Sequence, residues 1–237
     1  MHHPTAVIIE KDKRESEDIY VRYGIAALMA FQFHMIGRVD DCSRWSAQNL
    51  CIHDTYPAKA GKAKLSWSKN VHEERDAPWQ HLFGAIDWIF CVLLNVGLWL
   101  EVFHHAKPDA RLRPFIFGFT DEMDPEEAGK KAKRFVYRML RPIFNQMGIN
   151  LDHLRGLVGS HSIRKLASSW VRGNGISLDD KDYRGRWKRK RVSNVYDDIQ
   201  LDFVDAKVAS VLCPKGVANY VVVNKAVANE WTLDSYQ

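Results

Sequence analysis

The sequence has few cysteines and no segment of simple composition. Only four of its 237 residues are cysteine, and they lie far apart with no paired spacing: Cys42, Cys51, Cys91 and Cys213. Such spacing provides no disulfide framework. There is also no internal repeat, and no N-terminal segment combines a basic start, an apolar run and a small-residue cleavage site. We therefore expect a globular protein in a reduced, intracellular setting.

The chain also lacks a long hydrophobic run free of polar residues. Its longest apolar stretch, residues 82–103, is interrupted by Asp87, Asn95 and Glu101. A charged side chain at the centre of a bilayer is costly, so this stretch is not expected to span a membrane. We interpret it as a helix of the protein core.

Metal ligands in a recognisable pattern are missing as well. Adjacent acids occur at Asp40/Asp41, Asp179/Asp180 and Asp197/Asp198, but neighbouring side chains on a helix diverge and commonly act as caps or solvated surface. The pair His104-His105 has no cysteines at ligand spacing, and His72-Glu73-Glu74 lacks the second histidine of a zinc-protease helix. The sequence therefore predicts neither a metal nor another cofactor.

Positive charge is present, and it is concentrated in one segment. The whole chain carries a formal charge of +5. Residues 161–196 contain ten basic and three acidic residues, a net charge of +7, which leaves −2 for the rest of the chain. A local field of this kind attracts polyanions such as nucleic acids. The run Lys188-Arg189-Lys190-Arg191 taken alone also fits a solvated loop or a nuclear-import signal.

Hydrophobic periodicity predicts an α+β fold that is mainly helical. Apolar residues recur every three or four positions over residues 19–35, which is typical of a helix face. Strict alternation over residues 63–68 predicts a strand, and a return strand near 77–82 would complete a small antiparallel sheet. Further helices are expected at 83–104, from the acidic start at 121 to 146, and at 161–172, where Ser160 would be the N-cap and Gly173 and Gly175 would close the helix. Short helices are expected at 179–184, 192–199 and 202–212.

Four residues in the second half of the chain form a spaced pattern. His161 and Arg164 are three apart and so share one face of the first helical turn, where free backbone N–H groups also favour an anion. Trp187 follows 26 residues after His161, and Tyr196 nine residues after Trp187. Each motif alone is weak, because a pair of His and Arg at this spacing occurs by chance in many helices.

The joint pattern resembles the catalytic domain of the tyrosine recombinase (phage-integrase-like) family. That family has an early Arg, a Lys on a β-hairpin, His-x-x-Arg, a His or Trp, and then the Tyr nucleophile. Arg38 with Asp41 three residues later, and Lys69 at the turn between the two expected strands, match the remaining elements. Lys62 and Lys64 are rivals for the role of Lys69. The resemblance predicts a catalytic domain at 18–213, followed by an extension at 214–237, while residues 1–17 are polar without a sustained period and are expected to be a linker or N-terminal remnant.

The resemblance implies DNA cleavage and rejoining without metal or nucleotide. Tyr196 would be the nucleophile, with Tyr183 as a rival in the wrong register relative to Trp187. Arg38, His161, Arg164 and Trp187 would bind the scissile phosphate, and Lys69 would protonate the leaving 5′-hydroxyl. Asp41 would be structural support. Contact with double-stranded DNA is expected from Arg184, Arg186, Lys188, Arg189, Lys190 and Arg191.

Other expectations concern origin, assembly and alternatives. Segments 65–71 and 184–188 look like eukaryotic Crypton mobile elements, which implies DNA integration in the nucleus. The family's N-terminal DNA-clamping domain has no room before residue 18. The amphipathic segment 198–213 would mediate self-assembly on DNA, unless it packs on its own domain. A non-catalytic DNA-binding descendant of a recombinase and a type IB topoisomerase remain alternative functions.

Overall fold

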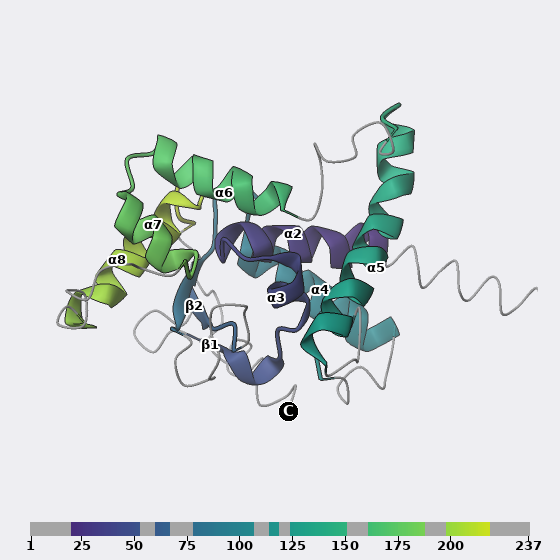
Figure 1. The fold of residues 1–237 in the computed structure, drawn as a ribbon, viewed down its shortest axis with the longest axis horizontal. Helices are drawn as coiled ribbons and strands as arrows, with labels where there is room; N and C mark the ends of the chain where they lie inside the picture. Colours follow the sequence, from purple (N-terminus) through teal and green to yellow (C-terminus); the bar gives the residue numbers. More distant parts are fainter. Residues whose placement is uncertain are drawn as a thin grey trace, which may run out of the picture.

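The computed structural model describes residues 20–52, 60–66, 78–106, 114–118, 124–150, 161–187 and 198–218. These residues form a mainly helical structure with one small antiparallel sheet, so the predicted α+β class is confirmed. In Figure 1, α5 (Pro125–Gln146) crosses one end of the central helix α2 (Ile25–His34), α7 (Leu178–Arg184) and α8 (Asp198–Val211) lie toward its other end, and α6 (Ser162–Gly173) runs alongside it. The predicted linker at 1–17, and the extension beyond residue 218, lie outside the described residues.

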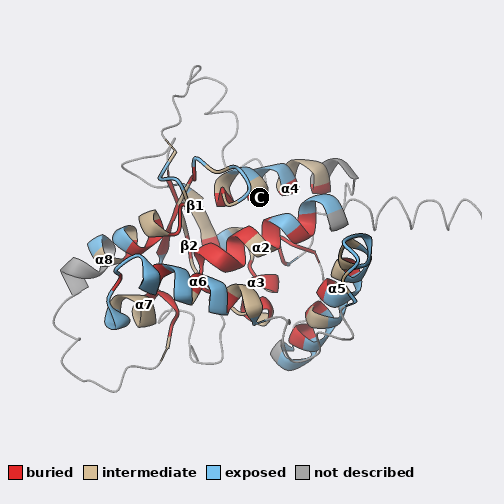
Figure 2. Ribbon diagram, turned by 90° about the horizontal axis from the view of Figure 1, so that it is seen from above, coloured by how far each residue is buried: buried red, intermediate tan, exposed pale blue. Residues whose placement is uncertain are grey.

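Helix α2 is the central element of the fold. A π-helical turn at Tyr20–Gly24 leads into α2 at Ile25–His34, close to the predicted range of 19–35. A short helix α3 follows at Val39–Ser43. Most residues of α2 are buried, and Figure 2 shows this buried character along most of the helix. Because α2 is covered on several sides, residues at its end lie deep in the protein.

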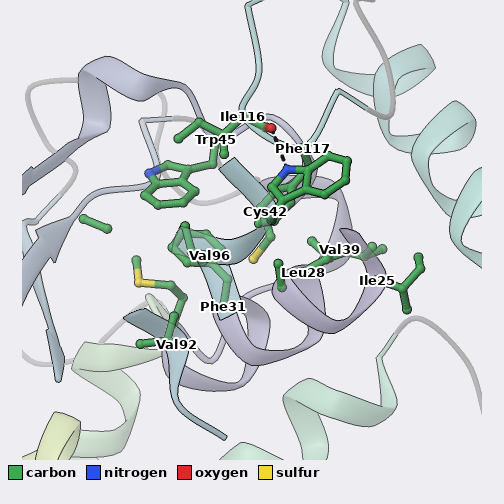
Figure 3. Close-up of a cluster of buried hydrophobic side chains, with 14 of the residues drawn as sticks. Ile25, Leu28, Phe31, Val39, Cys42, Trp45, Val92, Val96, Ile116 and Phe117 are labelled. Carbon is green, nitrogen blue, oxygen red and sulfur yellow. Dashed lines mark hydrogen bonds between the residues drawn. The ribbon is translucent and has the colours of Figure 1, made fainter. Parts of the chain in front are cut away.

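Two hydrophobic clusters meet on α2. The larger one combines α2 and α3 with Trp45, helix α4 (Val92–Ala106) and the residues Ile116 and Phe117, and Figure 3 shows its central side chains. Phe31 stacks on Trp45 with ring centroids 3.9 Å apart. The second cluster joins Phe33 and Ile36 to Val171 on α6 and Val208 on α8. The second cluster thus fixes α6 and α8 relative to the C-terminal end of α2.

The sheet has the strand order β1-β2-β3. Strand β1 spans Leu50–Ile52 after a 3-10 turn at Ala47–Asn49, β2 spans Ala60–Ala63, and β3 spans Gln80–Phe83. Both pairings are antiparallel, with Leu50 opposite Ala63 and Lys62 opposite His81. The predicted antiparallel sheet is therefore confirmed, although the turn expected to carry Lys69 lies outside the described residues.

The prediction of a strand at 63–68 was wrong in its bounds. The burial of Ala63, Lys64, Leu65 and Ser66 alternates as expected. The ladder nevertheless ends at Ala63, because the partner strand begins only at Leu50 and is preceded by the 3-10 turn. Burial thus alternates over residues 64–66 as well, although these residues are not part of the sheet.

The expected helix at 83–104 begins later than predicted. Residues 84–91 form turns, and α4 spans Val92–Ala106. The Asp87 carboxylate accepts a hydrogen bond from the Ile89 backbone N–H at 3.2 Å, and Gly84 pairs with the chain after α8. Val96, Trp99 and Phe103 are buried as expected of a core helix, whereas Leu94 and Leu98 are exposed. None of the helices in the described ranges is long and apolar enough to cross a membrane.

The remaining helices follow the predictions closely. Helix α5 spans Pro125–Gln146, and its N-cap Asp124 accepts hydrogen bonds from the backbone of Glu126 and Glu127. Helix α6 spans Ser162–Gly173 and α7 spans Leu178–Arg184, while the proposed cap Ser160 lies outside the described residues.

Helix α8 spans Asp198–Val211, so residues 198–199 belong to it; residues 192–197 of the expected helix at 192–199 are not described. It packs on its own chain through Val208, with Leu212 just beyond its end, which agrees with the alternative that this segment packs on its own domain. Phe203 is exposed. Self-assembly through α8 stays a prediction.

Candidate functional site

Arg38 lies in a tight connection between α2 and α3. It is the N-cap of α3 and has extended backbone angles. Two residues earlier, Ile36 has a φ of 45°, which is unusual for a β-branched residue and marks local strain. Gly37 follows, and a side chain there would overlap the Cys42 sulfur. The fold therefore holds the position of Arg38 through a strained turn.

His161 and Arg164 come from the start of α6. His161 directly precedes the helix, and Arg164 lies on its buried face, only 7% exposed. The Arg164 Nη2 donates to the Gly185 carbonyl at 2.7 Å. Its guanidinium also lies over the Trp187 ring, 4.4 Å from the centroid. Arg164 and Trp187 are thus in direct contact.

Trp187 is half-buried and is contacted by Arg164, Lys181 and Gly185. Lys181 approaches the same ring at 4.7 Å. Gly185 lies so close to the indole that a methyl group in its place would overlap the ring. Arg186, between them, has a φ of 55°, so this turn is strained like the one at Ile36. Two strained turns, one before Arg38 and one before Trp187, therefore border the site.

The charges of these residues interact. Burial, followed by the positive charges of Arg186 and Arg38, lowers the pKa of Arg164 to about 10. Burial also lowers the pKa of His161, and the positive charges of Lys133, Arg38 and Arg164 add to this effect against Asp40. Arg38, His161, Arg164 and Trp187 thus form one basic cluster, although they are up to 149 residues apart in the sequence.

Asp41 is the acid inside this cluster. It lies on α3 and is 3% exposed. Burial raises the pKa of Asp41, and the charges of Arg186, Arg38 and Arg164 oppose that rise. Its interpretation as a structural residue among the arginines agrees with this position. Even when Asp41 is ionised, Arg38, Arg164 and Arg186 leave an excess of positive charge that suits an anion.

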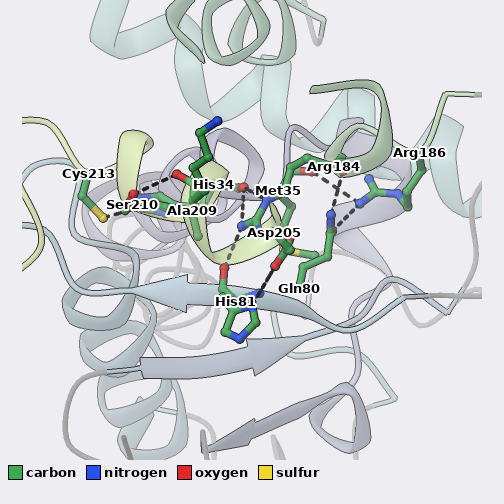
Figure 4. A network of polar contacts seen from close by, with 11 residues as sticks. His34, Met35, Gln80, His81, Arg184, Arg186, Asp205, Ala209, Ser210 and Cys213 are labelled. Atoms are coloured by element: carbon green, nitrogen blue, oxygen red, sulfur yellow. Dashed lines mark hydrogen bonds and ion pairs between the residues drawn. The ribbon is translucent and has the colours of Figure 1, made fainter. Parts of the chain in front are cut away.

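The expectation that Arg184 contacts DNA was wrong. Its side chain is fully buried and forms an ion pair with Asp205 of α8 at 2.6 Å. Its other N–H groups donate to the carbonyls of His34 and His81. Figure 4 shows this network between α2, β3, α7 and α8. Arg184 has no surface from which to reach a phosphate backbone, so its role is to join elements.

The expectation for Arg186 was also wrong. This residue is 8% exposed and donates to the Gln80 side chain at 2.8 Å (Figure 4). The Gln80 amide in turn donates to the Arg184 carbonyl at 2.7 Å. Sequence reasoning missed Gln80 and Asp205, because their partners lie more than twenty residues away and no local pattern marks them.

Several predicted residues lie outside the described residues: Lys69, Lys188, Arg189, Lys190, Arg191 and Tyr196. The two rivals of Lys69 are described. Lys62 lies on β2 and is half-buried, and Lys64 lies over the Trp79 ring at 5.4 Å. The rival nucleophile Tyr183 is half-buried on α7.

A basic surface on α5 was also missed. Helix α5 packs beside α3, where Gly129 lies against Asp40 and Lys133 forms an ion pair with Asp40 at 2.7 Å. The exposed basic residues at positions three and four apart make a stripe on this helix: Lys131, Arg134, Arg138 and Arg141. The dense basic residues from Lys130 to Arg141 were the available sequence signal.

The site contains no group of carboxylates, histidines or cysteines suited to a metal within the described ranges. Its chemistry is that of guanidinium, imidazole and indole donors, which favour an anion. Comparisons of the chain with protein-family models, with curated proteins and with solved structures find no match.

Proposed function

We propose that the chain cleaves and rejoins DNA strands through a covalent 3′-phosphotyrosyl intermediate, as a tyrosine recombinase does. One observation carries this proposal. Arg38, the His161/Arg164 pair and Trp187, selected by type and spacing, come from three separate segments, and their charges and rings interact. Integration of a Crypton-like mobile element in the nucleus is the narrower form of the proposal.

The cluster suits the charge of the reaction. When a tyrosine oxygen attacks phosphorus, negative charge develops on the non-bridging phosphate oxygens, which forked guanidinium donors match. Arg38 and Arg164 supply such donors from two different elements. Each preorganised donor in such a site contributes roughly 10²–10³ in rate. Trp187 adds an indole N–H, which can only donate.

The proton transfers are assigned from the types of the residues involved. A tyrosine hydroxyl titrates near ~10 and needs a base or a positive field to attack at neutral pH. The lowered pKa of His161 keeps this imidazole neutral and able to accept a proton. The Tyr196 oxygen then forms a bond to phosphorus, the bond to the 5′-oxygen breaks, and Lys69 gives a proton to the departing oxygen. Water and nucleotide are not consumed, so the reverse steps rejoin the strands.

The surface beside the cluster supports a DNA partner. The basic stripe lies on the same helix as Lys133, whose charge acts on His161, but on another face of that helix. Together with the run at 188–191 it provides many cations for a phosphate backbone. Sequence-independent attraction of this kind would bring a phosphodiester to the cluster.

The test is a covalent capture experiment. The full chain is incubated without magnesium on a nicked suicide DNA substrate, and adducts that survive denaturation are separated on a gel. We expect wild type to form an adduct and Tyr196→Phe to form none, because phenylalanine has no attacking oxygen. Tyr183→Phe is the matched control and should retain the adduct.

The alternatives predict different results. DNA binding by wild type without any adduct would favour the non-catalytic function. Cleavage that requires magnesium and persists in Tyr196→Phe would contradict the proposed mechanism. Relaxation of supercoiled DNA without recombination of defined sites would favour a topoisomerase.

A further inference from the structure

The turn that leads from α7 to Trp187 has the hydrogen bonds of a helix-ending Schellman motif. The Asp182 carbonyl accepts from the Trp187 backbone N–H at 3.0 Å, and the Tyr183 carbonyl accepts from the Arg186 backbone N–H at 3.1 Å. In this motif the residue after the helix end has a positive φ and is usually glycine. Here that residue is Arg186, with a φ of 55°. Since an arginine is strained in this conformation, the surrounding structure must hold it there.

Gln80 on β3 contacts this turn at two points (Figure 4). The Arg186 Nη1 donates to Gln80 Oε1 at 2.8 Å, and the Met35 carbonyl is a more distant acceptor of the same nitrogen at 3.4 Å. At the other end of the amide, Gln80 Nε2 donates to the Arg184 carbonyl at 2.7 Å. Arg184 is the last residue of α7, so its carbonyl has no partner within that helix. One side chain thus binds the turn before and after Gly185.

Both contacts depend on the amide group of Gln80. A guanidinium can only donate and a backbone carbonyl can only accept, whereas an amide has one end of each kind. The oxygen of Gln80 therefore faces Arg186 and its nitrogen faces Arg184. Gln80 is fully buried, so water does not replace either bond when the amide is removed.

The turn held by Gln80 makes two contacts with Arg164. The Gly185 carbonyl accepts from Arg164 Nη2 at 2.7 Å. The Trp187 ring lies 4.4 Å from the Arg164 guanidinium. Gly185 lies between the two residues that Gln80 binds, and Trp187 directly follows the second of them. A displacement of the turn would therefore change the position of Trp187 relative to Arg164.

Helix α7 has an anchor of its own. The buried Arg184 side chain forms an ion pair with Asp205 of α8 at 2.6 Å, and this contact does not involve the Gln80 side chain. Loss of the Gln80 amide should therefore leave α7 in place and release only the turn after it.

We propose that Gln80 is a positioning residue of the candidate site: its amide holds the turn 184–187 and thereby keeps Trp187 against Arg164. The proposal rests on the proposed cleavage function and adds to it a residue that acts through others. Because Gln80 is fully buried, it does not touch the DNA.

The first experiment follows the position of Trp187 without any reaction. Two-dimensional ¹⁵N–¹H spectra of the full chain separate the indole N–H signals of its eight tryptophans, and Trp187→Phe identifies the signal of Trp187 by its loss. We expect Gln80→Met to shift this signal, because the ring moves relative to the Arg164 guanidinium. Asn49→Leu is the matched control. It removes another buried amide, which donates to Ser46 Oγ at 2.9 Å, and should leave the Trp187 signal in place.

The second experiment separates reaction from binding. Single-turnover adduct formation is measured on the suicide substrate, and affinity for intact duplex DNA is measured by fluorescence anisotropy. Gln80→Met should slow adduct formation about 100-fold, a loss typical of a displaced reacting or binding group. Its affinity for DNA should stay within about threefold of wild type, because affinity comes mainly from phosphate contacts that Gln80 does not make.

The variant Gln80→Glu removes only one of the two contacts. Its carboxylate still accepts from Arg186, but beside two arginines it stays ionised and cannot donate to the Arg184 carbonyl. This variant should therefore recover part of the rate lost in Gln80→Met.

The results that would overturn the proposal are specific. They are a wild-type Trp187 signal or cleavage rate in Gln80→Met, an equal signal shift in Asn49→Leu, a parallel loss of DNA affinity, or no recovery in Gln80→Glu. If wild type forms no adduct, the proposed function fails, and the indole signal decides alone: a shift in Gln80→Met supports the positioning role and an unchanged signal overturns it. If Gln80→Met does not fold, a shifted signal with slower cleavage in Gln80→Glu supports the proposal, and wild-type values overturn it.

Discussion

At the residue scale, arginines from one short basic stretch have opposite environments. Arg184 pairs with Asp205 and donates hydrogen bonds to two backbone carbonyls. Its positive charge is therefore balanced inside the protein. Arg164 uses one N–H for the Gly185 carbonyl and one face for Trp187, which leaves other donors of its fork. The charge count of a segment therefore overstates how much of it can meet a polyanion.

Gly185 is a residue-scale requirement of the site. Its backbone angles are ordinary, but a methyl group there would overlap the Trp187 ring. We expect Gly185→Ala to push Trp187 away from Arg164, to destabilise the protein by about 1–3 kcal/mol through overpacking, and to slow adduct formation at least tenfold. Gly173→Ala is the control, since nothing lies within 4 Å of that position. Equal urea midpoints and cleavage rates for both variants would show that Trp187 is not held by this contact.

At the element scale, α5 offers a test of the DNA surface. Arg134 and Arg141 are exposed and lie two turns apart on one stripe. If both contact phosphates, Arg134→Gln with Arg141→Gln should reduce the slope of log affinity against log salt by about 2. Lys207→Gln with Lys215→Gln makes the same change in net charge on other elements and should leave the slope close to wild type. Fluorescence anisotropy of labelled duplex DNA over a salt series measures both, and equal slopes would exclude α5 from the interface.

The elements were predictable where a local signal set their ends. Asp124 and Pro125 set the start of α5, within the acidic segment from residue 121 that was expected to begin it, and Gly175, with a φ of 81°, follows the end of α6. The start of α4 was missed because the apolar run does not change at residue 92. The interruption there comes from the Asp87 turn and from pairing with residues after α8, which are far away in the sequence.

At the scale of the whole molecule, the sequence predicted which residues form the candidate site but not which residues surround them. His161 and Arg164 were found because one helical turn relates them. The inward orientation of Arg184 and Arg186 depends on Gln80 and Asp205, which folding brings from β3 and α8. The C-terminal end of α2 contacts α6 and α8 through Phe33 and Ile36, and the His34 carbonyl accepts hydrogen bonds from Arg184. The position of this helix end therefore determines how the buried arginines are oriented.

Because His34 is buried at the end of this central helix, its protonation affects the stability of the protein in acid. Its Nε2 donates to the Phe90 carbonyl at 2.9 Å, and Nδ1 is buried with no hydrogen-bond partner in the described parts of the chain. Burial lowers the pKa of His34 to about 3, whereas an unfolded histidine titrates near ~6.5. Between these values the unfolded chain binds a proton that the folded one excludes. The contribution of His34 is therefore complete above pH ~6.5 and is lost as pH falls toward 3.

Replacement of His34 should flatten this dependence. Wild type should lose roughly 1.4 kcal/mol of unfolding free energy per pH unit through His34 between about pH 6 and 4. His34→Gln keeps a donor for the Phe90 carbonyl but cannot titrate, so its stability should fall less steeply by that amount. His161→Gln removes a histidine that is largely exposed and should change the slope less. Urea unfolding at several pH values gives the slopes, and an unchanged slope in His34→Gln would mean that the end of α2 opens to admit the proton before the protein unfolds.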